Sequence, residues 1–174
     1  MSQSQPSESK LANIILKLNL QPHPEGGFFN ENYRSDGIIL SECLGANYTG
    51  ERNFSTSIYF LLTSDVFSAF HRIVQDEIWH FYDGSPIELH SITHDGIYTN
   101  TIIGRDIENG EIPQFVVPGG SWFGAIVIRK NDYTLLGCTV APGFDFRDFE
   151  LAERNELILK FPQYSEIINR LTRG

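Results

Sequence analysis

The sequence predicts a mainly β protein, an antiparallel sandwich or barrel with helices at both ends of the chain. Between residues 54 and 140, short runs of Val, Ile, Thr and aromatic residues alternate with turn signals, as expected for consecutive antiparallel strands. On either side, apolar residues recur every three or four positions, which is typical of amphipathic helices. The turn signals are Asp83-Gly84, Asp95-Gly96, Asn109-Gly110 and Asn131-Asp132.

The chain has 174 residues, enough for one domain with a sizeable core. Residues 1–10 are polar and predict a flexible tail, whereas residues 11–174 predict a single domain without a repeat or a linker. The first helix should place one apolar stripe on the sheet and end before Pro22, which cannot continue a helix. Its stripe consists of Leu11, Ile14, Ile15 and Leu18.

The middle of the chain predicts a strand over residues 66–73, a short connection, and a return strand over residues 77–83. Because side chains alternate along a strand, His71 should share the inward face with Phe67 and Ala69. By the same rule Glu77 should point inward with Trp79, and His80 should point outward. We therefore expect His71 and Glu77 to meet inside the fold. Residues 36–53 predict only a weak strand and a loop.

The C-terminal part predicts two short helices separated by Pro162. Their apolar stripes are Leu157, Ile158 and Phe161, then Tyr164, Ile167, Ile168 and Leu171. An acidic cluster precedes them, formed by Asp145, Asp148 and Glu150. We interpret this cluster as a helix N-terminal cap rather than a metal site.

Composition excludes several partners. The chain carries 13 basic and 22 acidic residues, a formal net charge of -9, which repels nucleic-acid backbones and anionic lipid surfaces. No apolar run approaches the roughly 18 residues that a membrane span requires. Cys43 and Cys138 match no metal-ligand spacing, so we expect reduced thiols in a cytoplasmic protein.

Residues 70–84 resemble the first motif of the cupin superfamily. His71 matches its first His and Glu77 its Glu, but Ile73 replaces the second His. The second cupin motif aligns with residues 118–123, where Phe123 replaces the remaining His. Because two of the four ligand positions lack a donor atom, we expect neither a metal nor another cofactor.

A closer resemblance, over about residues 11–171, is to the cupin-like family DUF985. It rests on residues 22–28 (PHPEGGF) with Tyr33-Arg34, on residues 57–62, 70–72 and 76–79, and on residues 140–146 with 148–150. The resemblance implies a jelly-roll (cupin) barrel with a ligand-sized cavity, commonly a homodimer, and no settled reaction. The fold by itself narrows function very little.

His71 and Glu77 are the candidate catalytic residues. In this interpretation His71 is a general base, and Glu77 fixes its tautomer and raises its basicity. A tyrosine, Tyr59 or Tyr33, would return a proton on the opposite face. Two alternatives remain open: His71 as a buried histidine satisfied by a backbone carbonyl, and Glu77 as a structural partner of His71 or Arg72.

The candidate ligand-binding residues surround this pair. In the Glu25-Gly26-Gly27 turn, glycines permit close approach of the backbone to a ligand, and Arg34 can fork onto a carboxylate or phosphate. The full set is Glu25, Tyr33, Arg34, Tyr59, Trp79 and Gln114, although tryptophan is more often a core residue. The remaining histidines, His23, His90 and His94, show no ligand spacing and are expected at the surface.

Two function classes are consistent with these residues. The first is a metal-independent isomerase or epimerase that uses the His/Glu pair on a small metabolite. The second is a protein that binds a small molecule without catalysis. A third hypothesis is a metal-dependent cupin enzyme. It is disfavoured because only His71 and Glu77 match the metal-ligand positions.

Overall fold

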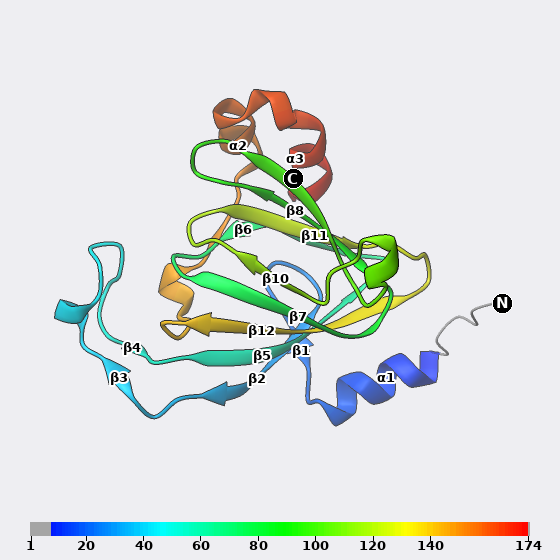
Figure 1. The fold of residues 1–174 in the computed structure, drawn as a ribbon, viewed down its shortest axis with the longest axis horizontal. Coiled ribbons are helices and arrows are strands. Elements are labelled where there is room, and N and C mark those ends of the chain that lie inside the picture. The colour runs from blue at the N-terminus through cyan, green and yellow to red at the C-terminus, as the bar shows by residue number, and fades with distance from the viewer. Residues whose placement is uncertain (1–7, 174) are drawn as a thin grey trace.

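The computed structural model describes residues 8–173, and in them two antiparallel sheets pack face to face (Figure 1). The six-stranded sheet has the order β1-β2-β5-β12-β7-β10 and the five-stranded sheet the order β13-β6-β11-β8-β9. The mainly β prediction is confirmed. The six-stranded sheet contains β1 (Gln21–Pro22), β2 (Phe28–Arg34), β5 (Thr56–Thr63), β7 (Asp76–Gly84), β10 (Gln114–Val117) and β12 (Tyr133–Ala141). The five-stranded sheet contains β6 (Phe67–Arg72), β8 (Ile87–Ile92), β9 (Tyr98–Ile103), β11 (Trp122–Val127) and β13 (Glu150–Leu151).

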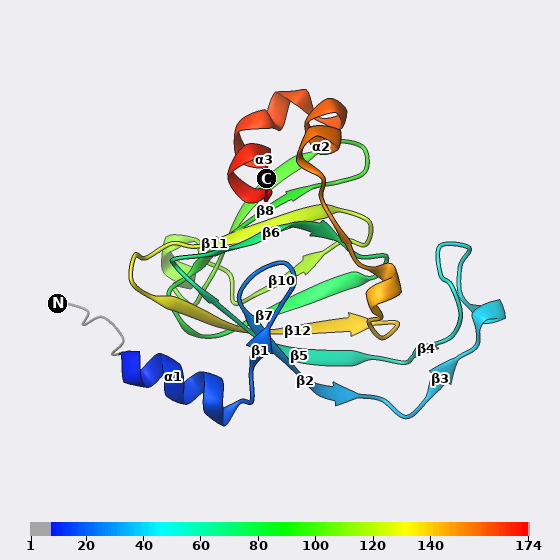
Figure 2. The ribbon, with the colours of Figure 1, turned by 180° about the vertical axis from the view of Figure 1, so that it is seen from behind.

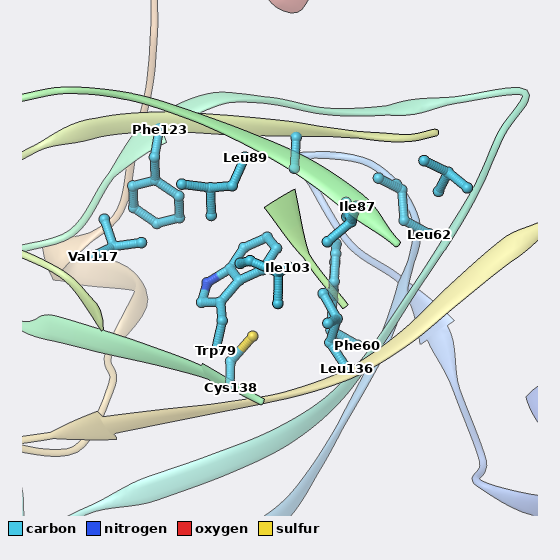
Figure 3. Close-up of a cluster of buried hydrophobic side chains, with 12 residues drawn as sticks. Phe60, Leu62, Trp79, Ile87, Leu89, Ile103, Val117, Phe123, Leu136 and Cys138 are labelled. Carbon is cyan, nitrogen blue, oxygen red and sulfur yellow. The ribbon is translucent and has the colours of Figure 1, made fainter. Parts of the chain in front are cut away.

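The main core lies between the inner faces of the two sheets (Figure 3). Trp79 of β7 and Phe123 of β11 approach each other edge to face, with ring centroids 6.2 Å apart. Each fully buried Leu, Ile or Phe side chain contributes about 1.5–3 kcal/mol to folding. The other buried members are Phe60, Leu62, Ile87, Leu89, Ile103, Val117, Ala125, Val127, Leu136 and Cys138.

Helices cover part of the outer face of each sheet. The predicted stripe of α1 (Glu8–Lys17) packs on Leu61 and Tyr133 of the six-stranded sheet. Helices α2 (Arg154–Lys160) and α3 (Ser165–Leu171) pack on Phe70 and Trp122 of the five-stranded sheet, at the top of Figure 2. Helix α1 begins at Glu8, so residues 8–10, expected in the tail, form its first turn. Residues 1–7 of that tail lie outside the described residues.

The irregular section between residues 36 and 53 forms a small arm that extends from the barrel (Figure 1). It contains the paired strands β3 (Ile38–Ile39) and β4 (Arg52–Asn53). Four 3₁₀ helices complete the described elements: η1 (Ser41–Cys43), η2 (Ile107–Asn109), η3 (Phe146–Asp148) and η4 (Pro162–Tyr164). The described helices include none long and apolar enough to cross a membrane.

The predicted turns and strand faces are confirmed, but one pairing is wrong. Gly84, Gly96, Gly110 and Asn131 all have positive φ, as tight turns require. Strands β6 and β7, expected to form a hairpin, instead belong to different sheets. Residues 73–75 therefore cross from one sheet to the other. As a result, the inward side chains of β6 and β7 face each other across the interior.

The acidic cluster also differs from its prediction as a helix cap. Only Asp145 caps a helix, accepting a hydrogen bond from the Arg147 backbone N–H at the start of η3. Asp148 forms a buried ion pair with Arg52, which joins η3 to β4. Glu150 pairs with Arg72 at the surface.

The Arg52–Asp148 pair provides a stability test. Removing one partner of a buried ion pair leaves an uncompensated charge, so Asp148→Asn should lower the free energy of unfolding by about 3–5 kcal/mol. Urea denaturation measures the change. The exposed Asp36 supplies the control, because Asp36→Asn should shift stability by less than about 0.5 kcal/mol. Equal effects of the two variants would contradict a stabilising role for this pair.

Candidate functional site

A cavity of about 300 Å³ opens at one end of the space between the sheets. Its walls come from β2, β5, β6, β7 and β12, from the turn over residues 23–27, and from the segment over residues 144–149. Its volume lies at the lower end of the range for small-molecule sites. The titratable side chains that line it are His23, Glu25, Glu31, Arg34, His71, Glu77, Cys138 and Asp145.

The glycine turn places Glu25 in this cavity. Gly26 and Gly27 have φ of 123° and 71°, and a Cβ on Gly26 would lie 2.2 Å from the carbonyl oxygen of Phe67. The Ala69 N–H donates to the Glu25 carbonyl at 2.8 Å. The turn therefore fits directly against β6, and any side chain at position 26 would push it away. Glu25 therefore lines the cavity, and its predicted role in binding a ligand stays a prediction.

The Glu25 carboxyl group is buried and has three polar neighbours. Ser68 Oγ donates to Oε1 at 2.8 Å, while Oε2 lies 3.0 Å from His71 Nε2 and 3.3 Å from His23 Nδ1. Burial raises the pKa of Glu25, but the two histidines and Ser68 together outweigh it. The pKa of Glu25 therefore lies below its ordinary value, and the carboxylate form is favoured.

His71 is held in one orientation by its two ring nitrogens. Nδ1 lies 2.8 Å from the Ala69 carbonyl oxygen, and because a carbonyl only accepts, Nδ1 carries a hydrogen. Nε2 faces Glu25, so this contact is a hydrogen bond only when a proton lies between the two groups. Burial lowers the pKa of His71, and Glu25 and the carbonyl oppose that shift. The pair can therefore take up one proton, which would lie between Nε2 of His71 and Oε2 of Glu25.

The predicted hydrogen bond between His71 and Glu77 is wrong, although both side chains line the cavity. Neither a hydrogen bond nor an ion pair joins these two described residues. Their strands lie in opposite sheets, so the cavity separates them. Glu77 Oε1 instead accepts from the Trp79 indole N–H at 3.0 Å, and the Cys138 thiol is a second partner. The acid partner of His71 is Glu25.

Glu77 has the opposite electrostatic character to Glu25. Burial and the nearby Glu25 carboxylate raise the pKa of Glu77 from 4.5 to about 7, against the opposing effects of Cys138, Trp79 and His23. Burial and the same carboxylates raise the pKa of the Cys138 thiol, which stays protonated. One cavity thus holds a charged carboxylate and, near neutral pH, a carboxyl group that retains its proton part of the time.

Arg34 lines the cavity but is already bound. Its guanidinium forks onto the Glu31 carboxylate at 2.8 and 2.7 Å. It also donates to Asn53 Oδ1 at 2.8 Å and to the Phe144 carbonyl at 3.1 Å. The predicted carboxylate is therefore a side chain of this protein rather than a ligand.

The other four predicted binding residues lie outside the cavity lining. Tyr33 is exposed on β2, and Tyr59 packs in the cluster beneath α1 on the outer face of the sheet. Gln114 is exposed and contacts His80 Nδ1 at 3.2 Å. Trp79 is a core residue that reaches the site only through Glu77. The outward orientation of His80 is confirmed by its contact with Thr139 Oγ1 at 3.2 Å.

The surface assignment of His23 is wrong. Its side chain is only 7% exposed, and its ring lies 4.6 Å from Phe29 and 5.8 Å from Phe149 between centroids. The available signal was its position two residues before Glu25 in the same family block. His90 is also buried, with Nδ1 2.7 Å from the Tyr98 hydroxyl. The exposure of His94 is confirmed.

The cavity does not fit the metal that many cupins bind. Ile73 and Phe123 occupy two of the ligand positions and have no donor atoms, and both nitrogens of His71 are engaged. Over residues 8–173, no group of three or more His, Cys, Asp or Glu side chains has the geometry of a metal site. We therefore derive no metal-dependent step for this site.

The fold and the cavity define a jelly-roll protein of the cupin type. Residues 12–152 match the Cupin superfamily (DUF985), so the chain belongs to this family. It is 33% identical over 149 residues to the uncharacterized protein YML079W of Saccharomyces cerevisiae, covering 80% of this chain and 74% of that one. A hypothetical protein from Leishmania major has 34% identity and a TM-score of 0.85, with 94% and 98% covered. Protein SO0799 from Shewanella oneidensis has 36% identity and a TM-score of 0.81, with 93% and 96% covered.

The raised pKa of Glu77 predicts a pH-dependent effect on stability. The folded protein binds this proton more tightly than the unfolded chain does, so Glu77 lowers the free energy of unfolding as pH rises from 4.5 to about 7. Glu77→Gln removes this effect. Relative to the parent, the variant should therefore gain about 3 kcal/mol between pH ~5 and pH ~8.

Urea denaturation of both proteins at the two pH values measures this difference. The charged or titratable groups that face Glu77 are Glu25, His23, His71 and Cys138, all present in both proteins. Glu108→Gln, at an exposed position, is the matched control and should show no such pH-dependent gain. If the difference between Glu77→Gln and the parent does not change with pH, Glu77 is not held uncharged in the folded state.

Proposed function

We propose that the cavity binds a small metabolite and transfers a proton between its two sides without a metal, as isomerases and epimerases do. One observation carries this proposal: two buried carboxyl groups in one cavity have pKa values shifted in opposite directions. Groups separated in this way divide the acid and base roles at a single pH. Glu25 and Glu77 therefore suit these two roles.

In the proposed reaction the Glu25–His71 pair accepts a proton from a carbon of the metabolite. Ser68 and His71 hold the Glu25 carboxylate in place, and the Ala69 carbonyl fixes the His71 ring. The protonated Glu77 donates a proton to the opposite side, so the number of protons on the metabolite is unchanged. Glu77 thus takes the role that the sequence suggested for Tyr59 or Tyr33.

Non-catalytic binding is the second candidate function. The observation that favours it is the occupancy of Glu25, whose two oxygens already meet three polar side chains. A carboxylate with this many hydrogen-bonding partners can serve to bind a ligand in one orientation as well as to transfer a proton. In this case the cavity would hold the metabolite, and none of its hydrogens would exchange with solvent.

Solvent exchange distinguishes the two functions. The protein is incubated with a metabolite extract in D₂O, and mass spectrometry detects any compound that gains deuterium only when the protein is present. We expect such a compound. His71→Asn and Glu77→Gln should each slow its labelling by about 10²- to 10⁴-fold, the usual contribution of a general acid or base.

The exposed variant Glu108→Gln should label at the parent rate, and circular dichroism should confirm that all variants fold. Labelling at the parent rate by His71→Asn would remove His71 from the mechanism. If no compound in the extract gains deuterium, the binding function replaces the catalytic one.

A further inference from the structure

The charges that line the cavity are strongly unequal. Four carboxyl groups, from Glu25, Glu31, Glu77 and Asp145, face a single guanidinium, from Arg34. The lining contains no lysine. A ligand therefore enters a space whose fixed charges are mainly negative, and an anion there meets repulsion unless a free cation or a group of N–H donors compensates it.

The guanidinium at this site does not compensate. Arg34 makes four hydrogen bonds with Glu31, Asn53 and Phe144, which engages four of its five N–H groups. The Asp145 carboxylate is likewise paired with Arg147, at 2.7 Å between Nη2 and Oδ2. Each of these two ion pairs is close to neutral. Glu25 and Glu77, with His71 and His23 beside Glu25, therefore set the charge of the interior.

Aromatic rings form much of the remaining wall. Phe144, Phe146 and Phe149 contact one another edge to face, with ring centroids 5.0, 6.0 and 6.4 Å apart. Phe29 and Phe60 also line the cavity. Phenyl faces carry partial negative charge and attract cations within about 6 Å. The rings and the two interior carboxyl groups thus favour the same ligand charge.

We propose that this cavity selects a compact organic cation, an alkyl- or arylammonium, over neutral and anionic molecules of the same shape. The inference rests on the proposed binding of a small metabolite and adds its chemical class. Because a cation beside Glu77 removes the proton that Glu77 would donate, the inference applies to the binding function and not to the proton transfer. The ammonium group would lie near Glu77 and Glu25, and the organic part would pack on the phenylalanine rings. Carboxylates and phosphates would find no lysine among the lining residues and only one unengaged N–H on the Arg34 guanidinium.

Binding of a cation should displace the Glu77 proton. A positive charge beside Glu77 stabilises its carboxylate and lowers its pKa from about 7. Below that pH, binding of the ammonium must therefore release the proton of Glu77. The affinity for the ammonium should then rise with pH up to about 7. Glu25, His23, His71 and Cys138 also face this position, so a Glu77→Gln variant is needed to assign the proton.

Titration calorimetry with three matched probes tests the inference: benzylammonium, benzyl alcohol and benzoate, at pH ~8. We expect benzylammonium to bind about tenfold more tightly than benzyl alcohol, as one charge-assisted contact provides, and benzoate to bind more weakly than both. At pH ~6, titrations in buffers of different ionisation enthalpy should show that binding of benzylammonium releases protons from the protein.

Two variants assign the effect to named residues. Glu77→Gln should weaken benzylammonium about tenfold, abolish the proton release, and leave benzyl alcohol within about twofold. Phe146→Leu, at a half-exposed ring, keeps an apolar wall without the aromatic face. It should weaken only the ammonium probe, by about two- to fivefold. Should Glu77→Gln fail to fold, Phe146→Leu still tests the selectivity.

The outcomes separate this inference from the proposed function. If benzyl alcohol or benzoate binds as tightly as benzylammonium, the charge class is wrong although the cavity binds small molecules. If none of the three binds at millimolar concentration, the cation inference is also overturned. Deuterium exchange into a metabolite reports on catalysis independently, so it can fail while the ammonium selectivity holds.

Discussion

The burial of the Glu25 carboxylate is the interaction on which the site depends. A charged carboxylate inside a protein is costly unless hydrogen bonds and charges compensate it. Here Ser68, His71 and His23 supply that compensation from β6 and from the turn itself. The turn can reach them only because Gly26 lies against the backbone of β6. The orientation of His71 and the raised pKa of Glu77 both follow partly from this one buried charge.

The hydrophobic core supports the cavity, because aromatic residues of the core contact the titratable side chains of the site. Phe123 lies 4.1 Å from His71 between ring centroids and also touches Trp79. Trp79 in turn donates to Glu77. The two titratable groups on opposite sheets are therefore positioned by the same aromatic pair that closes the core. Dense packing leaves these side chains little room to move. The separation of His71 from Glu77 across the cavity is therefore set by the packing of the two sheets.

The arginines around the cavity form ion pairs with carboxylates of this protein. Glu31 binds Arg34, Asp145 binds Arg147, and Asp148 binds Arg52. The Asp148–Arg52 pair joins the segment over residues 144–149 to β4. Arg34 also donates a hydrogen bond to the Phe144 carbonyl of that segment. Because these guanidinium groups are already paired, we expect the interior carboxyl groups and the phenylalanine rings to determine which ligand the cavity prefers.

The fold class, the strand faces and the turns could be predicted from the amino-acid sequence. Strand alternation correctly placed His71 and Glu77 inside and His80 outside, since side-chain direction along a strand is a local property. Composition likewise established the negative charge, and the family resemblance led to Glu25. These features depend on residues close together in the chain.

Which residues meet depends on how the sheets pair and pack. The chain crosses between sheets at residues 73–75, which separates His71 from Glu77, and the turn over residues 23–27 brings Glu25 and His23 to His71 from more than forty positions away. Arg34 meets the Phe144 carbonyl, and Tyr59 packs with α1, for the same reason. Contacts between distant segments depend on sheet pairing and packing, and alternation within a strand carries no information about the sheet in which that strand pairs.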